Sequence, residues 1–102
     1  DSISVYDRED NVLFVGDNVE KPLPYLYSRD LEQYQRTLDS YLKFKAKRII
    51  AGHCATVTRK TIRQDLEYLR AFSSNKTRKY ETGRFKQAHG QNVKVMQMLR
   101  NK

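Results

Sequence analysis

The stretch that most constrains the fold is residues 11–18 (NVLFVGDN), in which four apolar residues run into a glycine and then an aspartate. No polar residue alternates among the four apolar ones, which predicts a short strand buried on both faces of a sheet. Gly16 ends this strand and allows the backbone to turn. Asp17 is therefore expected at the carboxyl-terminal edge of the sheet, where α/β proteins collect their chemistry.

A second stretch, residues 48–53 (RIIAGH), repeats this order with a histidine in place of the aspartate. If the two strands are parallel in one sheet, Asp17 and His53 leave it at the same edge, and both residue types are good metal ligands. Two simpler roles stay open at this point. Asp17 can cap a turn or a helix, and His53 can be a structural histidine.

The remaining patterns predict an α/β layer architecture. Residues 2–7 alternate polar and apolar side chains, and a connector of hairpin length joins them to the strand at 12–15, which indicates an antiparallel pair. A helix is expected from an N-cap at Ser28 to about Lys45 and a second from an N-cap at Thr58 to about Ser73, each with an apolar stripe. The resulting order is strand, strand, helix, strand, helix.

Two further segments have a less regular pattern. Residues 18–27 contain two prolines among leucines and tyrosines, so this loop can either wall a pocket or lie as an apolar flap on the surface. Residues 74–102 are expected to form a basic, exposed linker and a C-terminal helix, which Gly90 weakens. The predicted division is a folded part at 1–73 and this tail at 74–102.

Composition narrows the class of protein. The 102 residues suffice for one domain with a modest core. The single cysteine, Cys54, excludes an internal disulfide and fits a reducing compartment. No run of 18 apolar residues and no signal peptide is visible, so we expect a soluble, cytoplasmic protein without a membrane span.

The positive charge is concentrated in the tail. Residues 76–102 hold eight Lys or Arg and one acid, whereas residues 1–75 hold twelve bases and eleven acids. The tail can be an electrostatic footprint for nucleic acid, an oligomerisation module or a solvated terminal helix. All three readings stay open from the sequence.

Taken together, the motifs SISVYD, VLFVGD and IIAGH, followed by a helix, resemble the C-terminal half of the metallo-β-lactamase fold, as in glyoxalase II-like hydrolases. The resemblance spans about residues 1–72 and implies half of an αββα fold: a β-hairpin, a helix, a strand and a helix, with a C-terminal helix added. It further implies that Asp17 is the aspartate that bridges two metal ions and that His53 binds one of them. Cys54 stands where family members usually have glycine, and its thiol is either beside the metal or passive packing.

The family's principal metal motif, His-x-His-x-Asp-His, has no counterpart here, since the chain's only histidines are His53 and His89. The chain therefore resembles a truncated piece that begins after the third metal-binding element. In the intact protein the resemblance implies a dinuclear site that activates water for attack on an ester, thioester, amide or phosphodiester. Zinc, iron and manganese all suit aspartate and histidine.

Two protein ligands are too few for a catalytic zinc site, which needs about three. We therefore expect the isolated chain to lack hydrolase activity and to bind metal weakly or not at all. The expected partner is the missing N-terminal half of the fold or a second copy of the chain, because a half-fold exposes a sheet face and edge.

Overall fold

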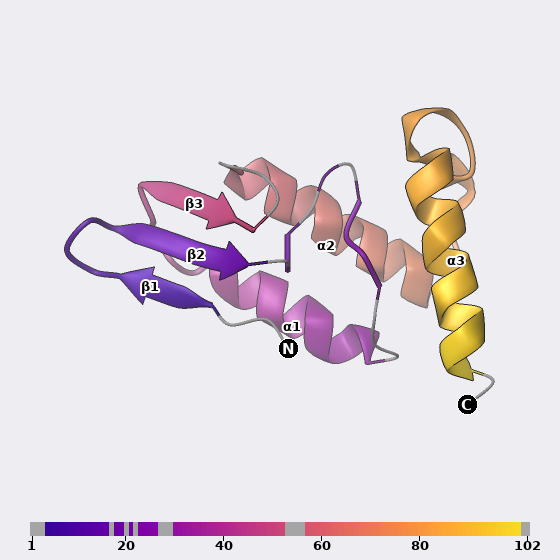
Figure 1. Ribbon diagram of the computed structural model, residues 1–102, viewed down its shortest axis with the longest axis horizontal. Coiled ribbons are helices and arrows are strands. Elements are labelled where there is room, and N and C mark those ends of the chain that lie inside the picture. The colour runs from indigo at the N-terminus through magenta and orange to yellow at the C-terminus, as the bar shows by residue number, and fades with distance from the viewer. Residues whose placement is uncertain are drawn as a thin grey trace.

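The computed structural model describes residues 4–16, 18–19, 21, 23–26, 30–52 and 57–100. A three-stranded sheet has the order β1-β2-β3. β1 (Val5–Asp7) pairs antiparallel with β2 (Val12–Gly16), and β2 pairs parallel with β3 (Arg48–Ala51) (Figure 1). The predicted α/β class and the hairpin are confirmed, and the condition that the two strands lie parallel in one sheet is met.

The hairpin connector is fixed by its own polar side chains. Oδ1 of Asp7 accepts hydrogen bonds from the backbone amides of Glu9 (3.0 Å) and Asp10 (3.2 Å). Asn11 has a φ of 55°, a left-handed conformation that asparagine tolerates better than most residues. Its carbonyl accepts a hydrogen bond from the amide of Lys47 (2.8 Å), which holds the start of β3 beside the hairpin.

Two helices, α1 (Leu31–Tyr41) and α2 (Arg59–Ser73), pack side by side on one face of the sheet (Figure 1). The predicted N-cap of α2, Thr58, is confirmed, and its side chain accepts from the amide of Thr61. The prediction for α1 was wrong in detail: Asp30 is its N-cap, Ser28 lies outside the described residues, and the helix ends at Tyr41 rather than near Lys45. Asp30 caps the helix because its carboxylate accepts a hydrogen bond from the Gln33 amide (2.9 Å).

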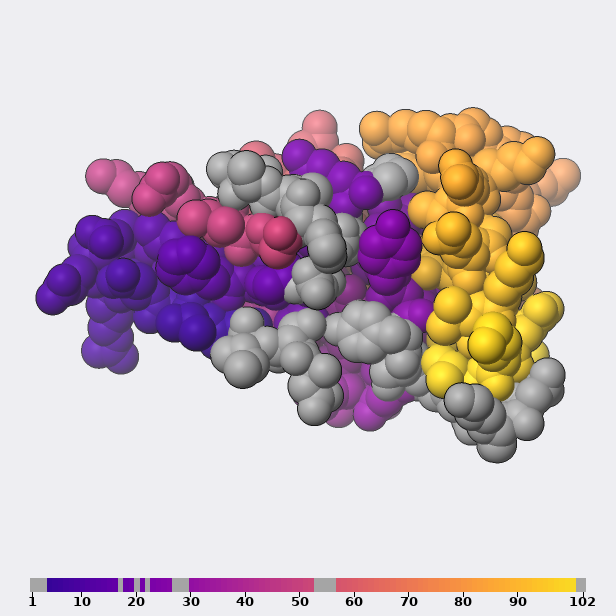
Figure 2. Space-filling model, viewed as in Figure 1, coloured from indigo at the N-terminus to yellow at the C-terminus, as the bar shows by residue number. Residues whose placement is uncertain are grey.

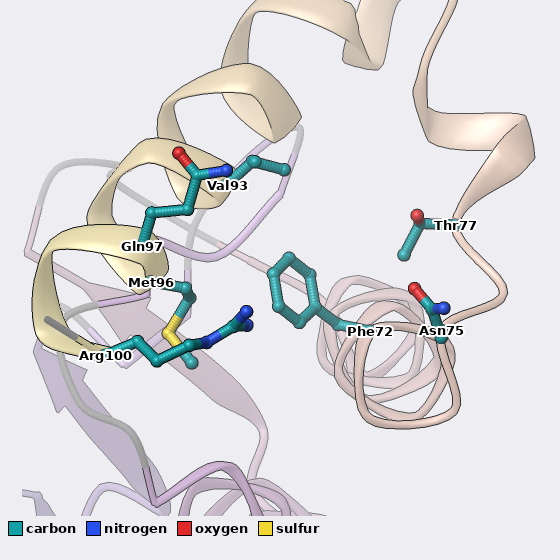
Figure 3. A pocket seen from close by; sticks show the side chains of 7 residues that line it. All are labelled: Phe72, Asn75, Thr77, Val93, Met96, Gln97 and Arg100. Atoms are coloured by element: carbon teal, nitrogen blue, oxygen red, sulfur yellow. The ribbon is translucent and has the colours of Figure 1, made fainter.

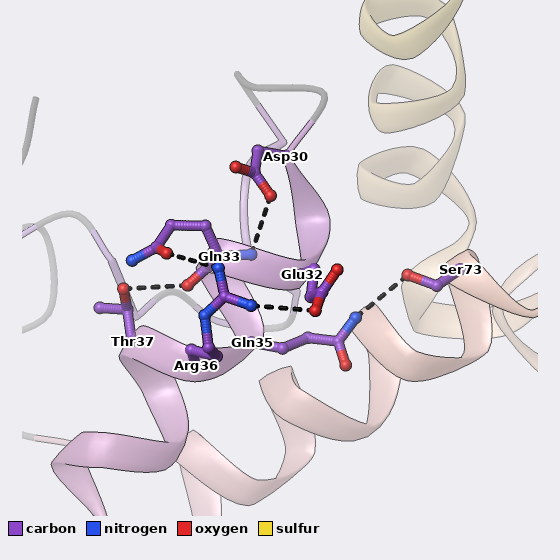
Figure 4. A network of polar contacts seen from close by, with 7 residues as sticks. All are labelled: Asp30, Glu32, Gln33, Gln35, Arg36, Thr37 and Ser73. Atoms are coloured by element: carbon purple, nitrogen blue, oxygen red, sulfur yellow. Dashed lines mark hydrogen bonds and ion pairs between the residues drawn. The ribbon is translucent and has the colours of Figure 1, made fainter.

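The exposed side of α1 carries a short polar network (Figure 4). Arg36 forms an ion pair with Glu32 (2.9 Å) one turn earlier in the helix. Gln35 donates from Nε2 to the hydroxyl of Ser73 (3.1 Å), the last residue of α2. The two helices are thus tied at their surface as well as through the apolar core.

One face of the sheet is covered by the helices, whereas the other face is exposed at Val5 and Phe14 but buried at Val12. Leu13, Val15 and Ile49 are buried in the core with both helices. Phe14 and its register partner Val5 are 41% and 53% exposed on the opposite face. The prediction that the 12–15 strand is buried on both faces was therefore wrong: an apolar strand residue looks the same in sequence whether or not its covering layer is present.

The C-terminal region wraps back onto α2. Two short 3-10 turns, η1 (Arg78–Tyr80) and η2 (Gly83–Phe85), lead into α3 (Lys86–Arg100), which crosses the C-terminal end of α2 at one end of the molecule (Figures 1 and 2). Tyr80 is only 4% exposed and packs edge-to-face on Tyr68, with ring centroids 4.8 Å apart. The expectation of an exposed linker therefore fails at Tyr80, whose ring joins the core.

The expected C-terminal helix is present as α3, and Gly90 lies inside it. Phe85, Ala88 and Met96 pack against the core. Among the helices formed by the described residues, none has the length and apolar character needed to cross a membrane.

Candidate functional site

The ends of β2 and β3 lie side by side at one edge of the sheet. Gly16 and Ala51 are register partners, and the amide of Gly52 donates a hydrogen bond of 2.8 Å to the carbonyl of Gly16. Gly16 has a φ of 58°, in the region that glycine occupies without steric cost. The register shifts between Phe14 and Gly16, an irregularity of the kind that often re-aims a side chain beside a functional site.

The two predicted metal ligands follow directly on this pair of glycines in the sequence, Asp17 after Gly16 and His53 after Gly52. Both ligands lie outside the described residues, as does Cys54. The described backbone therefore confirms that the parallel strands end together, whereas the ligand roles of Asp17 and His53 stay predictions. Among the residues that the structure describes, no group of three His, Cys, Asp or Glu side chains could hold a metal ion.

Two tyrosines of α1 hold the residue that follows Asp17. The Tyr34 hydroxyl donates to the carbonyl of Asn18 (2.8 Å), and Nδ2 of Asn18 donates to the Tyr41 hydroxyl (2.7 Å). Ser4, from the segment before β1, also shares a hydrogen bond with the Tyr41 hydroxyl. Asn18 and both tyrosines are buried, so these hydrogen bonds are shielded from water.

Tyr34 and Tyr41 belong to the apolar stripe expected for this helix, and the roles of their hydroxyls were not predicted from the sequence. The signal that could have found them is the choice of tyrosine over leucine or phenylalanine on a buried stripe. A buried tyrosine hydroxyl usually has a hydrogen-bond partner. Here the partner is the backbone and side chain of the loop that begins at the sheet edge.

The loop after the sheet edge is clamped from the other side by α3. Oδ1 of Asn92 accepts from the amide of Leu26 (3.0 Å), and its Nδ2 donates to the carbonyl of Pro24 (2.9 Å) and to the Tyr68 hydroxyl (3.1 Å). Leu23, Pro24 and Leu26 are all buried. These three residues therefore pack into the molecule, whereas Tyr25 between them is 52% exposed, so the described loop is only partly a surface flap.

His89 belongs to the same buried cluster. Its Nδ1 shares a hydrogen bond of 2.8 Å with the Tyr68 hydroxyl, and its ring packs edge-on against Tyr68 and Phe72. Burial lowers the pKa of His89, and the nearby Glu81 carboxylate opposes this only in part. Burial also raises the pKa of Tyr68 to about 12, although its hydrogen bond with Asn92 acts in the other direction. His89 is therefore a structural histidine at the α2–α3 contact.

One carboxylate in the core was not anticipated. Asp65 lies on the inner face of α2 between Ile62 and Leu66 and is 1% exposed. A carboxylate buried to this degree requires polar partners to offset its lost hydration. Its position on an otherwise apolar helical stripe is the sequence signal that would have identified it.

Comparisons with known proteins agree with the architecture. A family model described as the metallo-beta-lactamase superfamily matches residues 1–53, just over half of the 102-residue chain. The matched segment includes β1, β2, α1 and β3 and ends at His53. No curated protein and no solved structure matches this chain.

Proposed function

Because this chain belongs to the metallo-β-lactamase superfamily, we propose that it is part of a metal-dependent hydrolase in which Asp17 and His53 are metal ligands. The observation that carries this proposal is the Gly52–Gly16 hydrogen bond, because it joins the two residues that precede these ligands. The chemistry of the two side chains also fits a divalent metal ion, since a carboxylate and a neutral imidazole together suit zinc, iron or manganese.

Each residue has a distinct proposed role. The Asp17 carboxylate would hold metal and help to orient the attacking water, and the His53 imidazole would hold metal through a neutral ring nitrogen. Tyr34 and Tyr41 limit the movement of the segment after Asp17 by their hydrogen bonds to Asn18. A divalent metal ion bound at the site would lower the pKa of a water molecule there.

The chain supplies only part of such a site, so we propose that a partner completes it. The candidates are the missing N-terminal half of the fold and a second copy of the chain. The open face of the sheet, where Val5 and Phe14 are exposed, supports a covering partner. On this basis the isolated chain has no hydrolase activity.

Metal content tests the ligand roles. Elemental analysis of the purified chain is compared with that of the Asp17→Ala, His53→Ala double variant, and an Asp10→Ala, Asp39→Ala variant controls for the loss of exposed carboxylates. We expect any metal that the wild-type and control chains retain to be lost from the double variant. In the full-length protein, unchanged metal content and turnover after the double substitution would refute the proposal.

A second candidate function is nucleic-acid binding through the basic tail, with oligomerisation through the same region as its competitor. The observation that favours nucleic acid is the clustering of Arg84 of η2 with Lys86 and Lys94 of α3 along one groove, with no acid lining it. This function is compatible with the hydrolase proposal, because the groove and the sheet edge are built from different elements.

A further inference from the structure

A shallow groove of about 730 Å³ runs along the first half of α3. It is lined by three cationic side chains, two glutamines and two glycines: Gly83, Arg84, Lys86, Gln87, Gly90, Gln91 and Lys94. Lys86, Gly90 and Lys94 are spaced four residues apart, so they lie on one face of the helix. Where a side chain at Gly90 would project, nothing lies within 4 Å, which leaves the helix backbone accessible between the two lysines.

The charge of this groove is uncompensated by its lining residues. Glu67 of α2 is paired with Lys79 (2.8 Å) outside the groove, and Glu81, which influences the pKa of His89 on α3, does not line the groove either. Arg84 is held in place by stacking on the Phe85 ring, at 4.7 Å from its centroid. With a rise of about 1.5 Å per residue, Lys86 and Lys94 are separated by about 12 Å along the helix, which is far enough for the two lysines to contact different phosphates of one strand.

A second depression, a cleft of about 390 Å³, lies between the second half of α3 and the end of α2. It is lined by apolar and polar side chains: Phe72, Asn75, Thr77, Val93, Met96, Gln97 and Arg100. Figure 3 shows the Phe72 ring between the α3 side chains and the segment that carries Asn75 and Thr77. The cleft thus combines an aromatic ring with amide groups and a guanidinium.

We propose that α3 and the end of α2 bind a single-stranded polynucleotide, with its phosphates along Arg84, Lys86 and Lys94 and one base in the Phe72 cleft. The proposal deepens the second candidate function and rests on it, and it does not involve the metal ligands. Unstacked bases are recognised by aromatic stacking and by hydrogen bonds to their edges. Phe72 can stack on a base, and Asn75 and Gln97 can hydrogen-bond to its edge.

The cleft is the reason to choose a single strand over a duplex. Bases in a duplex are stacked on one another and present only their edges in the grooves, so a ring at the bottom of a cleft has no face to stack on. RNA and DNA single strands share the chemistry used here. The experiment therefore includes both.

Fluorescence anisotropy with labelled 12-mers of oligouridine and oligothymidine, and with a 12-bp DNA duplex, tests this in EDTA between 20 and 200 mM salt. We expect the single strands to bind more tightly than the duplex. The Arg84→Gln, Lys86→Gln, Lys94→Gln variant should lower the magnitude of the slope of log K against log salt by about 2, because each phosphate contact on a single strand contributes about 0.7. Phe72→Leu should weaken binding about tenfold.

The matched control is Lys43→Gln, Lys45→Gln, Lys47→Gln, which removes the same charge from the loop between α1 and β3 at the opposite end of the molecule (Figure 1). It should retain most of the wild-type slope, and all variants are first checked for folding by circular dichroism. Four results would overturn the proposal: no binding at 20 mM salt, equal losses in the two triple variants, duplex affinity equal to that of single strands, or full affinity in folded Phe72→Leu.

Two further measurements distinguish this proposal from lipid binding and from the metal-ligand proposal. Phosphatidylserine vesicles bound as tightly as the oligonucleotides would overturn it in favour of a lipid surface. Unchanged oligonucleotide binding by the Asp17→Ala, His53→Ala variant is expected, because the groove lies apart from the sheet edge. The two proposals can therefore fail independently: loss of the metal-ligand proposal would not affect oligonucleotide binding, and absence of oligonucleotide binding would not affect the metal-ligand proposal.

Discussion

Gly52 donates its backbone amide to the carbonyl of Gly16 across two parallel strands, at a distance of 2.8 Å. This hydrogen bond joins two residues that are 36 positions apart in the chain. Because each glycine is followed by a predicted metal ligand, the spacing of the ligands depends on the pairing of β2 with β3. Changes that disturb this pairing, or the loop that leaves it, should therefore disturb the site.

Tyr41→Phe tests the support of that loop. The substitution keeps the ring and removes the hydroxyl that accepts from Nδ2 of buried Asn18. Leaving a buried polar group short of a partner costs about 1–3 kcal/mol, and we expect a loss of unfolding free energy in that range by urea denaturation. Tyr25→Phe, which alters an exposed tyrosine, is the control and should be nearly neutral. Equal effects of the two changes would contradict the assignment.

Asn92→Ala tests the clamp between α3 and the loop. Asn92 is 1% exposed and hydrogen-bonds Pro24, Leu26 and Tyr68. Its truncation removes three hydrogen bonds at once, so we expect destabilisation by about 3 kcal/mol. Gln91→Ala, at an exposed position of the same helix, should change stability by less than about 0.5 kcal/mol. A small effect of Asn92→Ala would show that the loop is held by apolar packing alone.

The stability of the fold should decrease in mild acid through His89. Burial lowers the pKa of His89 in the folded state, so the unfolded chain binds a proton first, near the ordinary value of about 6.5. Stability is then full above that pH and falls as the pH drops below it, until the folded state is protonated as well. Glu81 partly opposes the shift, and Tyr68 contributes its hydroxyl but no charge at these pH values.

Thermal unfolding at pH 7.5 and 5.5 measures this dependence. We expect a lower melting temperature at pH 5.5 for the wild-type chain and a smaller difference between the two pH values for His89→Gln. Exposed Gln87→Ala provides a control that retains the histidine. An unchanged pH dependence in His89→Gln would place the acid sensitivity on other groups.

Self-association should depend on the open face of the sheet. Light scattering at high concentration should detect oligomers of the wild-type chain, since Phe14 and Val5 expose a paired apolar surface there. Phe14→Glu should yield a monomer, whereas Met98→Glu, which alters a side chain 64% exposed on α3, should not. The opposite result would place the interface on α3, and a monomeric wild-type chain would contradict self-association altogether.

Much of the fold was predictable because the decisive signals are local. The apolar runs that end in Gly16 and Gly52 predict the two strands, and Thr58 marks the start of α2. The exposure of Phe14 was not predictable, because an apolar side chain carries no record of whether a covering layer is present. Tyr80 was placed in a linker because its neighbours are polar, although its own ring is buried against Tyr68.

The candidate site was predictable only as far as the strand ends. The pattern indicated two strands that end in glycine, and their parallel pairing, which was only a condition of the prediction, is found in the structure. The role of Asn92 was not accessible, because a lone asparagine in a helix gives no indication of partners 66 and 68 residues away. Hydrogen bonds between distant segments depend on how the whole chain packs, and local sequence patterns do not contain that information.

The clamp by Asn92 also sets an order of events during synthesis. A ribosome releases the chain from its N-terminus, so the sheet, α1 and the loop at residues 23–26 emerge well before α3. The contacts of Pro24 and Leu26 with Asn92 are among the most non-local in the fold, and such contacts form late because the intervening chain must first be ordered. The loop beside the sheet edge therefore reaches its final conformation only when the last helix has been made.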